Sequence, residues 1–247
     1  MFGILGRIFG IFRRRISTEE QLLQKLGLKA FPPYELDEKK NRKLRKLLPH
    51  ITLGLCIELE RKYPSFGQIT AEREVYNFEA PEFLMRLAEL EESPPPKLPG
   101  IYGWYFDKRP PKVPRKSRVN INGCRLLYIG ITERGLHDRI LSDHFRGNAE
   151  GSNLRLKLGC LLRKKLRLKL QKVGNRLTFG EGEDKLSKWI AEHARVYYWA
   201  SNRTAQLERI AILRYSPPLN ADYNKDHPFY PRLKKIIDTC KTKARQT

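Results

Sequence analysis

Two short segments decide the fold of this chain: IYGWYF at residues 101–106 and RLLYIGI at residues 125–131. Both are rich in aromatic and branched apolar residues, a composition that favours extended strands. The loop between them runs from Asp107 to Arg118, is interrupted by prolines, and carries six basic residues against one acidic residue. Because two consecutive strands joined by one loop pair most simply side by side, we predict an antiparallel hairpin.

Helical patterns and a third strand follow the hairpin. Leucine spacing and capping residues predict, in order, a helix from Thr132 to about Phe145, a long basic helix over 153–172, a helix over 184–193, a strand over 195–200 and a helix over 205–215. The order β-β-α-α-α-β-α predicts an α/β (α+β) fold, in which helices flank a small three-stranded antiparallel sheet.

The region before the hairpin has a different character. Residues 17–92 carry helical patterns and no catalytic constellation, and the proline-rich stretch EESPPPKLP follows at 91–99. Such a stretch is typical of a domain boundary. We therefore predict a helical accessory region with a basic and apolar N-terminal arm over 1–95, the main domain over 96–230, and a basic C-terminal helix or tail over 231–247.

Charge points to a polyanionic partner. The chain has 49 Lys and Arg against 27 Asp and Glu, so that 49 − 27 gives a net charge of +22. Nucleic acid is the default partner for such a chain, and an acidic membrane surface is the rival. The four cysteines form no C-x-x-C pair and have no histidine at ligand spacing, which argues against a structural zinc site and a disulfide framework. We read them as reduced thiols and expect an intracellular protein (cytoplasm or nucleoid).

The N-terminal segment MFGILGRIFGIF at 1–12 is mostly apolar and is followed by three arginines. A signal peptide would place the charge before the apolar run, and a membrane span needs about 20 apolar residues. We therefore do not expect a membrane protein. An amphipathic anchor formed by residues 1–15 stays open as an alternative.

Gly100-Ile101-Tyr102 and Tyr128-Ile129-Gly130 spell both halves of the motif that names the GIY-YIG nucleases. Either tripeptide alone is a weak signal, but both occur in order on the two predicted hairpin strands. Arg139, Glu208 and Asn220 follow where the family has its remaining elements. Residues 98–226 thus resemble the GIY-YIG superfamily, and the chain is similar to an uncharacterised branch of it.

The resemblance implies a divalent-metal-dependent DNA endonuclease that uses Mg²⁺ or Mn²⁺. Glu208 would hold the ion, because Mg²⁺ keeps several waters and takes substrate oxygens as further ligands. Tyr102 would lie beside the attacking water as general base, and Tyr128 would position the water or the phosphate. A phenol with a pKa of about 10 is a poor base unless a cation lowers that pKa, and the metal ion or Arg139 are the two candidates.

Arg139 would contact the scissile phosphate through its planar fork of donors. Many relatives place a histidine or tyrosine four residues after the arginine, but that position is Asp143 here. His144 lies five residues on, rotated by about 100° on an α-helix. We keep His144 as a catalytic candidate, with His137 as its competitor. Asn220 is expected to orient the loop or a tyrosine hydroxyl.

The basic loop and the basic helix are the predicted phosphate-contacting surfaces, although a solvated basic face is the plainer interpretation. The predicted contacts are Lys108, Arg109, Arg115, Lys116, Arg118, Arg155, Lys157, Arg163, Lys164 and Lys165. The substrate is expected to be DNA, with RNA left open. A single active site per chain needs a homodimer or two sequential events to break both strands. The competing hypothesis is a non-catalytic nucleic-acid-binding module on the same scaffold.

Overall fold

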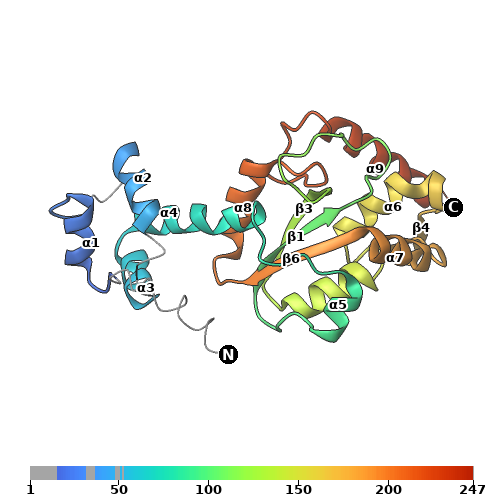
Figure 1. Ribbon diagram of the computed structural model, residues 1–247. Helices are drawn as coiled ribbons and strands as arrows, with labels where there is room; N and C mark the ends of the chain where they lie inside the picture. The colour runs from blue at the N-terminus through green and yellow to red at the C-terminus, as the bar shows by residue number, and fades with distance from the viewer. Residues whose placement is uncertain (1–15, 32–36, 48–50, 52, 247) are drawn as a thin grey trace, which may run out of the picture. The chain divides into compact units, whose positions relative to one another are not determined.

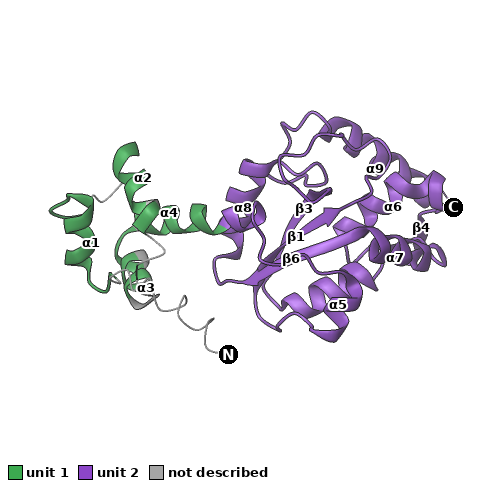
Figure 2. Cartoon of the chain, in the orientation of Figure 1, with its two compact units in different colours: residues 1–74 green, residues 75–247 purple. Residues whose placement is uncertain are grey.

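A computed structural model describes residues 16–31, 37–47, 51 and 53–246. The segment Met1 to Arg15, which carried the anchor alternative, lies outside the described residues. The chain divides into two compact units, residues 1–74 and 75–247 (Figure 2). No helix in the described ranges is both long enough and apolar enough to cross a membrane.

The first unit is helical. Its helices are α1 (Glu19–Leu26), α2 (Glu38–Leu47), α3 (Leu53–Lys62) and α4 (Pro64–Val75), the last of which ends at the boundary between the units. Thr18 caps the start of α1, and Gly27 ends it in the left-handed conformation that favours glycine. Apolar side chains from α1, α2, α3 and α4 form a core of their own.

The second unit is built on an antiparallel sheet of order β2-β3-β1-β6 (Figure 1). Its strands are β1 (Gly100–Phe106), β2 (Asn120–Ile121), β3 (Cys124–Thr132) and β6 (Ala194–Ala200). The three long strands confirm the predicted three-stranded sheet and hairpin. The short β2 extends it by pairing with the start of β3.

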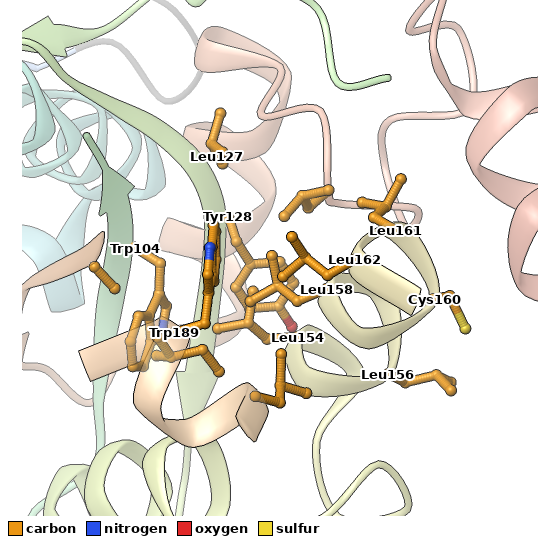
Figure 3. Close-up of a cluster of buried hydrophobic side chains, with 14 of the residues drawn as sticks. Trp104, Leu127, Tyr128, Leu154, Leu156, Leu158, Cys160, Leu161, Leu162 and Trp189 are labelled. Carbon is orange, nitrogen blue, oxygen red and sulfur yellow. The ribbon is translucent and has the colours of Figure 1, made fainter. Parts of the chain in front are cut away.

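Helices surround this sheet, and the large core lies between them and the strands. Following the chain, they are η2 (Tyr76–Phe78), α5 (Leu87–Glu92), η3 (Asp138–Phe145), α6 (Asn153–Leu166), α7 (Gly182–His193), α8 (Thr204–Tyr215) and α9 (Tyr230–Arg245). Helix α8 packs against β3 and β1, whereas α6 packs against α7 and α9. Figure 3 shows Leu154, Leu158 and Leu162 of α6 beside Tyr128 of β3.

The two faces of β1 have different roles, because side chains alternate along a strand. Tyr102, Trp104 and Phe106 belong to the core that α6 and α7 cover. On the other face, the Tyr105 hydroxyl donates a hydrogen bond of 2.8 Å to the carbonyl of Phe78 in η2. One face of β1 therefore anchors residues 76–78, and the other presents the first motif tyrosine to the helices.

The predicted basic helix over 153–172 was too long. Helix α6 ends at Leu166, because Arg167 takes the left-handed conformation with φ 55°. A small hairpin follows, formed by β4 (Gln171–Val173) and β5 (Arg176–Thr178) around Gly174. The basic residues continue past the end of the helix, so the charge pattern alone suggested that the helix continues.

The boundary between the units falls before the proline-rich stretch rather than within it. Met85 pairs with Val196 of β6 through two backbone hydrogen bonds of 2.9 and 3.0 Å, and Leu90 lies in the large core. At the other end, α9 contributes Leu233 and Ile236 to the same core. Residues 75–99 and α9 thus pack with the domain that carries the motif.

Candidate active site

The glycine that ends the second half of the motif makes room for the tyrosine of the first half. Tyr102 on β1 pairs with Gly130 on β3. A Cβ atom at Gly130 would lie 2.5 Å from the Tyr102 hydroxyl oxygen and 2.7 Å from its ring. Any side chain here would therefore displace the phenol, since carbon atoms normally stay about 3.5 Å or more apart.

Tyr102 lies at the centre of a buried polar cluster. Its side chain is fully buried, and its hydroxyl oxygen lies 3.2 Å from Arg139 Nε and 2.8 Å from His144 Nε2. Burial raises the pKa of Tyr102 to about 12, while the charge and hydrogen bond of Arg139 act in the opposite direction. The phenol is thus protonated at neutral pH and has a cationic donor and an imidazole as neighbours.

The histidine that seemed out of register contacts Tyr102 because the segment before it is a π-helix. In η3 the hydrogen bonds join residues five apart, and the amide of Arg146 donates to the carbonyl of Leu141 over 3.1 Å. This wider turn brings His144 to the same hydroxyl group that Arg139 contacts. An α-helix would have presented Asp143 there instead, so the five-residue spacing and the π-helix compensate for each other.

His144 is held in place from its other ring nitrogen. Nδ1 lies 2.6 Å from the hydroxyl oxygen of Ser152, which also accepts the amide hydrogen of Arg155 as the N-cap of α6. Burial, together with the charges of Arg139 and Arg155, lowers the pKa of His144 well below its ordinary value. The imidazole is therefore neutral at pH 7. A tautomer with hydrogen on Nδ1 donates to Ser152 and leaves Nε2 free to accept the Tyr102 proton.

Arg139 has one part of its fork still available. Its Nη1 atom donates to Asp143 and to the carbonyl of Gly151, each over 2.9 Å, and Nε contacts Tyr102. Nη2 has no hydrogen-bond partner among the described residues, and the side chain is 21% exposed. The guanidinium is thus fixed in orientation while one donor group stays free for an anion.

Tyr128 and Lys157 lie beside this cluster. The Tyr128 ring centroid is 6.2 Å from that of His144, and Lys157 Nζ lies 5.5 Å from the same tyrosine ring. Burial raises the pKa of Tyr128. Burial also lowers the pKa of Lys157 to about 8, although Asp222 and Glu208 act to raise it. The Tyr128 hydroxyl forms no hydrogen bond with any residue that the structure describes.

Glu208 has a carboxylate with no hydrogen bond or ion pair to the described residues. Burial and the charge of Asp222 raise its pKa, whereas Lys157 lowers it. A carboxylate with no internal partner has all its lone pairs available, so its chemistry fits a hard divalent cation. Within the described ranges, no group of three or more His, Cys, Asp or Glu side chains is arranged to hold a metal ion.

Asn220 bonds to the backbone of the second motif strand. Its Oδ1 accepts from the Ile129 amide over 2.9 Å, and its Nδ2 donates to the Ile129 carbonyl over 2.8 Å. The side chain thus pairs with β3 as a neighbouring strand would. Among the described residues it forms no hydrogen bond with either motif tyrosine hydroxyl, so its effect on the site is to hold Ile129, the residue next to Tyr128.

His137, the competing histidine candidate, is not part of the polar cluster around Tyr102. His137 pairs with the neighbouring Asp138 at 2.8 Å and is partly exposed. Two groups that sequence reasoning did not assign are in it: Ser152, which fixes His144, and Asp143, which fixes Arg139. The signal for Ser152 was its place as a helix cap in front of a basic helix.

Within the predicted phosphate-contacting set, the expectation for Arg155 is wrong, because Arg155 is fully buried. Its fork donates to Glu183, to Ser187 and to the carbonyls of His144 and Phe145, so it cannot reach DNA. Lys157 is also buried, at 8% exposure. Both residues belong to α6, and their aliphatic stems allow them to lie on its buried face. The sequence had suggested that these basic residues lie on the solvent-exposed face.

The remaining basic residues lie nearer the surface. Lys108, Arg115, Lys116, Arg118, Lys164 and Lys165 are exposed, and Arg109 and Arg163 are partly buried. Burial and the neighbouring Lys108 ammonium lower the pKa of Lys165, because the basic loop and the end of α6 lie close together at these two residues. Arg163 instead donates to Cys240 of α9 at 3.2 Å.

Comparison with known proteins identifies the family of this domain. The family model of the GIY-YIG catalytic domain matches residues 100–243, which is more than half of the chain. The match begins at the first motif glycine and includes most of α9. No curated protein and no solved structure matches the chain.

Proposed function

The chain belongs to the GIY-YIG catalytic-domain family, and we propose that it is a divalent-metal-dependent endonuclease that hydrolyses phosphodiester bonds in DNA. The family itself supports a nuclease-type function. The metal, the DNA substrate and the roles of individual residues are our proposal. The observation that carries it is the Tyr102 hydroxyl, which lies 2.8 Å from a neutral imidazole and 3.2 Å from a guanidinium.

This arrangement provides a route for the proton of the attacking water. As the water oxygen bonds to phosphorus, the Tyr102 oxygen takes the water proton, and the phenol proton moves to His144 Nε2. The imidazole is neutral beforehand, so it has a free lone pair for that proton. Tyr102 therefore never has to exist as a free phenolate, which its raised pKa would oppose at neutral pH.

Charge stabilisation comes from two sides of the cluster. The free Nη2 of Arg139 donates to a non-bridging oxygen of the phosphate, where negative charge grows in the transition state. Glu208 would hold a Mg²⁺ or Mn²⁺ ion, which when bound would supply Lewis-acid stabilisation of the charge that develops on the phosphate and the leaving group. Tyr128 lines the same place and orients the water or the phosphate.

The basic loop and the end of α6 supply general affinity for the nucleic-acid backbone. Lys108, Arg115, Lys116 and Lys165 are exposed and make contacts that carry no sequence information. DNA is the proposed substrate and RNA is the alternative. We also propose an intracellular location, and a homodimer where both strands are cut together.

The test compares the wild-type chain with Tyr102→Phe and Glu208→Ala on supercoiled plasmid and on branched DNA, with and without Mg²⁺ or Mn²⁺. Tyr105→Phe is the matched control, because Tyr105 lies on the same strand and bonds to η2 on the opposite face. We expect cutting by the wild type and the control only, and only with metal. A wild type that cuts none of these substrates would leave the non-catalytic binding module as the better account. Variants that cut as fast as the wild type would instead show that the reaction does not depend on Tyr102 and Glu208.

A further inference from the structure

Lys157 is a buried cation without an internal partner. It lies in the first half of α6 and is 8% exposed. Its ammonium forms no hydrogen bond and no ion pair with the residues that the structure describes. Most of the side chain is withdrawn from water and its ammonium has no internal acceptor, so a ligand that reaches the nitrogen and supplies acceptors would bind it favourably.

The position of Lys157 points to the ligand. Its ammonium lies over the ring of Tyr128, and the negative charges that act on it are Glu208 of α8 and Asp222, with Lys241 of α9 as an opposing cation. These carboxylates influence the ammonium through space and do not pair with it directly. The ammonium thus lies on the Tyr128 side of the active site, near the carboxylate to which we assign the metal.

We propose that the Lys157 ammonium binds the scissile phosphodiester itself, as a second catalytic cation beside Arg139. This inference rests on the proposed nuclease function. Arg139 contacts the phosphate from the Tyr102 side, and Lys157 contacts it from the Tyr128 side. The three donors of the ammonium then find non-bridging oxygens, and a charge that is costly in the free protein becomes favourable in the complex.

A buried position makes this contact stronger than an ordinary phosphate contact. An exposed lysine acts through water and is screened by salt, whereas a group inside the protein acts through a lower dielectric. The α6 backbone also fixes Lys157, because Ser152 caps the helix one turn earlier and Leu158 packs in the core. The charge is therefore in place before the substrate arrives and needs no reorganisation as the transition state forms.

The plainer role is packing, because the aliphatic stem of Lys157 covers the Tyr128 ring. Lys157→Met keeps an unbranched stem and removes only the charge, and Lys157→Arg keeps the charge. Lys185→Met is the control, since Lys185 is exposed on α7 and outside the site. Each variant also needs its melting temperature, which a loss of packing would lower.

Two measurements on the full chain decide the matter. Binding of a short fluorescein-labelled duplex in EDTA should weaken about tenfold for Lys157→Met, because a charged hydrogen bond is lost, and Lys157→Arg should restore it. Single-turnover cleavage with Mg²⁺ should slow about 100-fold for Lys157→Met, as for the loss of one preorganised donor. Lys185→Met should change neither quantity more than about twofold.

The outcomes separate this inference from the proposed function. If the wild type cuts no DNA, the nuclease proposal fails, while the tenfold loss of affinity would still place Lys157 on the phosphate. Lys157→Met that binds and cuts like Lys185→Met overturns the inference. A lower melting temperature for Lys157→Met, with no recovery of binding in Lys157→Arg, overturns it in favour of packing.

Discussion

Two polar networks lie side by side in the catalytic domain, and they differ in how completely their hydrogen bonds are satisfied. Around Arg155, the guanidinium nitrogens all donate to Glu183, to Ser187 or to backbone carbonyls. Around Tyr102, the described residues leave Arg139 Nη2 and the Glu208 carboxylate without a partner. Ser152 joins the two networks, since it bonds to both His144 and the Arg155 amide.

The difference separates a structural network from a functional one. A fully bonded buried charge holds neighbouring elements together and has no group left for a ligand. A partly bonded network costs stability when empty, and it persists where a ligand can complete it. The Arg155 network therefore stabilises η3, α6 and α7, whereas the Tyr102 network keeps groups that the proposed phosphate and metal ion would bind.

Removing the charge from the satisfied network should have the largest effect. Arg155→Met removes the cation that binds Glu183 Oε2 and the donor that the carbonyls of His144 and Phe145 share, so the free energy of unfolding should fall by about 3–5 kcal/mol. Urea denaturation measures it. A loss below about 1 kcal/mol would mean that the network contributes little to stability.

The same substitution in the open network should act on cleavage instead. Arg139→Met removes the free Nη2 donor and the Tyr102 contact, so the single-turnover rate should fall by about 100- to 1000-fold. The free energy of unfolding should change by less than about 2 kcal/mol, because Arg139 is partly exposed. Equal stability losses at Arg139 and Arg155 would remove the distinction between the networks.

A pH titration of stability tests the neutral imidazole. The folded pKa of His144 lies below its unfolded value of about 6.5, so the unfolded chain binds the extra proton first as the pH falls. Stability should therefore fall below pH 6.5, by up to about 1.4 kcal/mol per pH unit from this group. His144→Gln should show a shallower loss between pH 7.5 and 5.5 in urea unfolding. An identical slope in both proteins would mean that folding does not lower the pKa of His144.

The exposed loop should show the smallest effect. Lys116→Met removes one surface phosphate contact, so DNA affinity should fall only slightly and the slope of log affinity against log salt should decrease by about 1. Fluorescence anisotropy across a salt series measures the slope. A slope equal to that of the wild type would place Lys116 away from the DNA.

The sequence predicted much of the fold because its patterns are local. The strands containing Tyr102 and Tyr128, and the helices α7 and α8, match their predicted positions within a few residues. The C-terminal end of α6 did not match its predicted position. The helix ends where Arg167 takes the left-handed conformation, and the pattern of basic residues has no break there. The place of residues 75–99 could not be predicted, because it depends on long-range pairing of Met85 with β6.

The candidate site was predictable as a set of residues and not as a geometry. The motif locates both tyrosines, Arg139 and Glu208. No local sequence pattern predicts that η3 is a π-helix, and the contact between His144 and the Tyr102 hydroxyl depends on it. The burial of Arg155 was equally hidden, because its partner Glu183 lies 28 residues later. Sequence spacing identifies the candidate residues, whereas tertiary packing decides which of their polar groups form hydrogen bonds inside the protein.

The most direct test of the central claim uses Glu208→Gln, which keeps the size of the side chain and removes its charge. Single-turnover cleavage of supercoiled plasmid with Mg²⁺ should fall by at least about 100-fold, because metal charge stabilisation is worth several kcal/mol. DNA binding in EDTA should stay equal to that of the wild type or become tighter. Cleavage by Glu208→Gln at the wild-type rate would contradict the account.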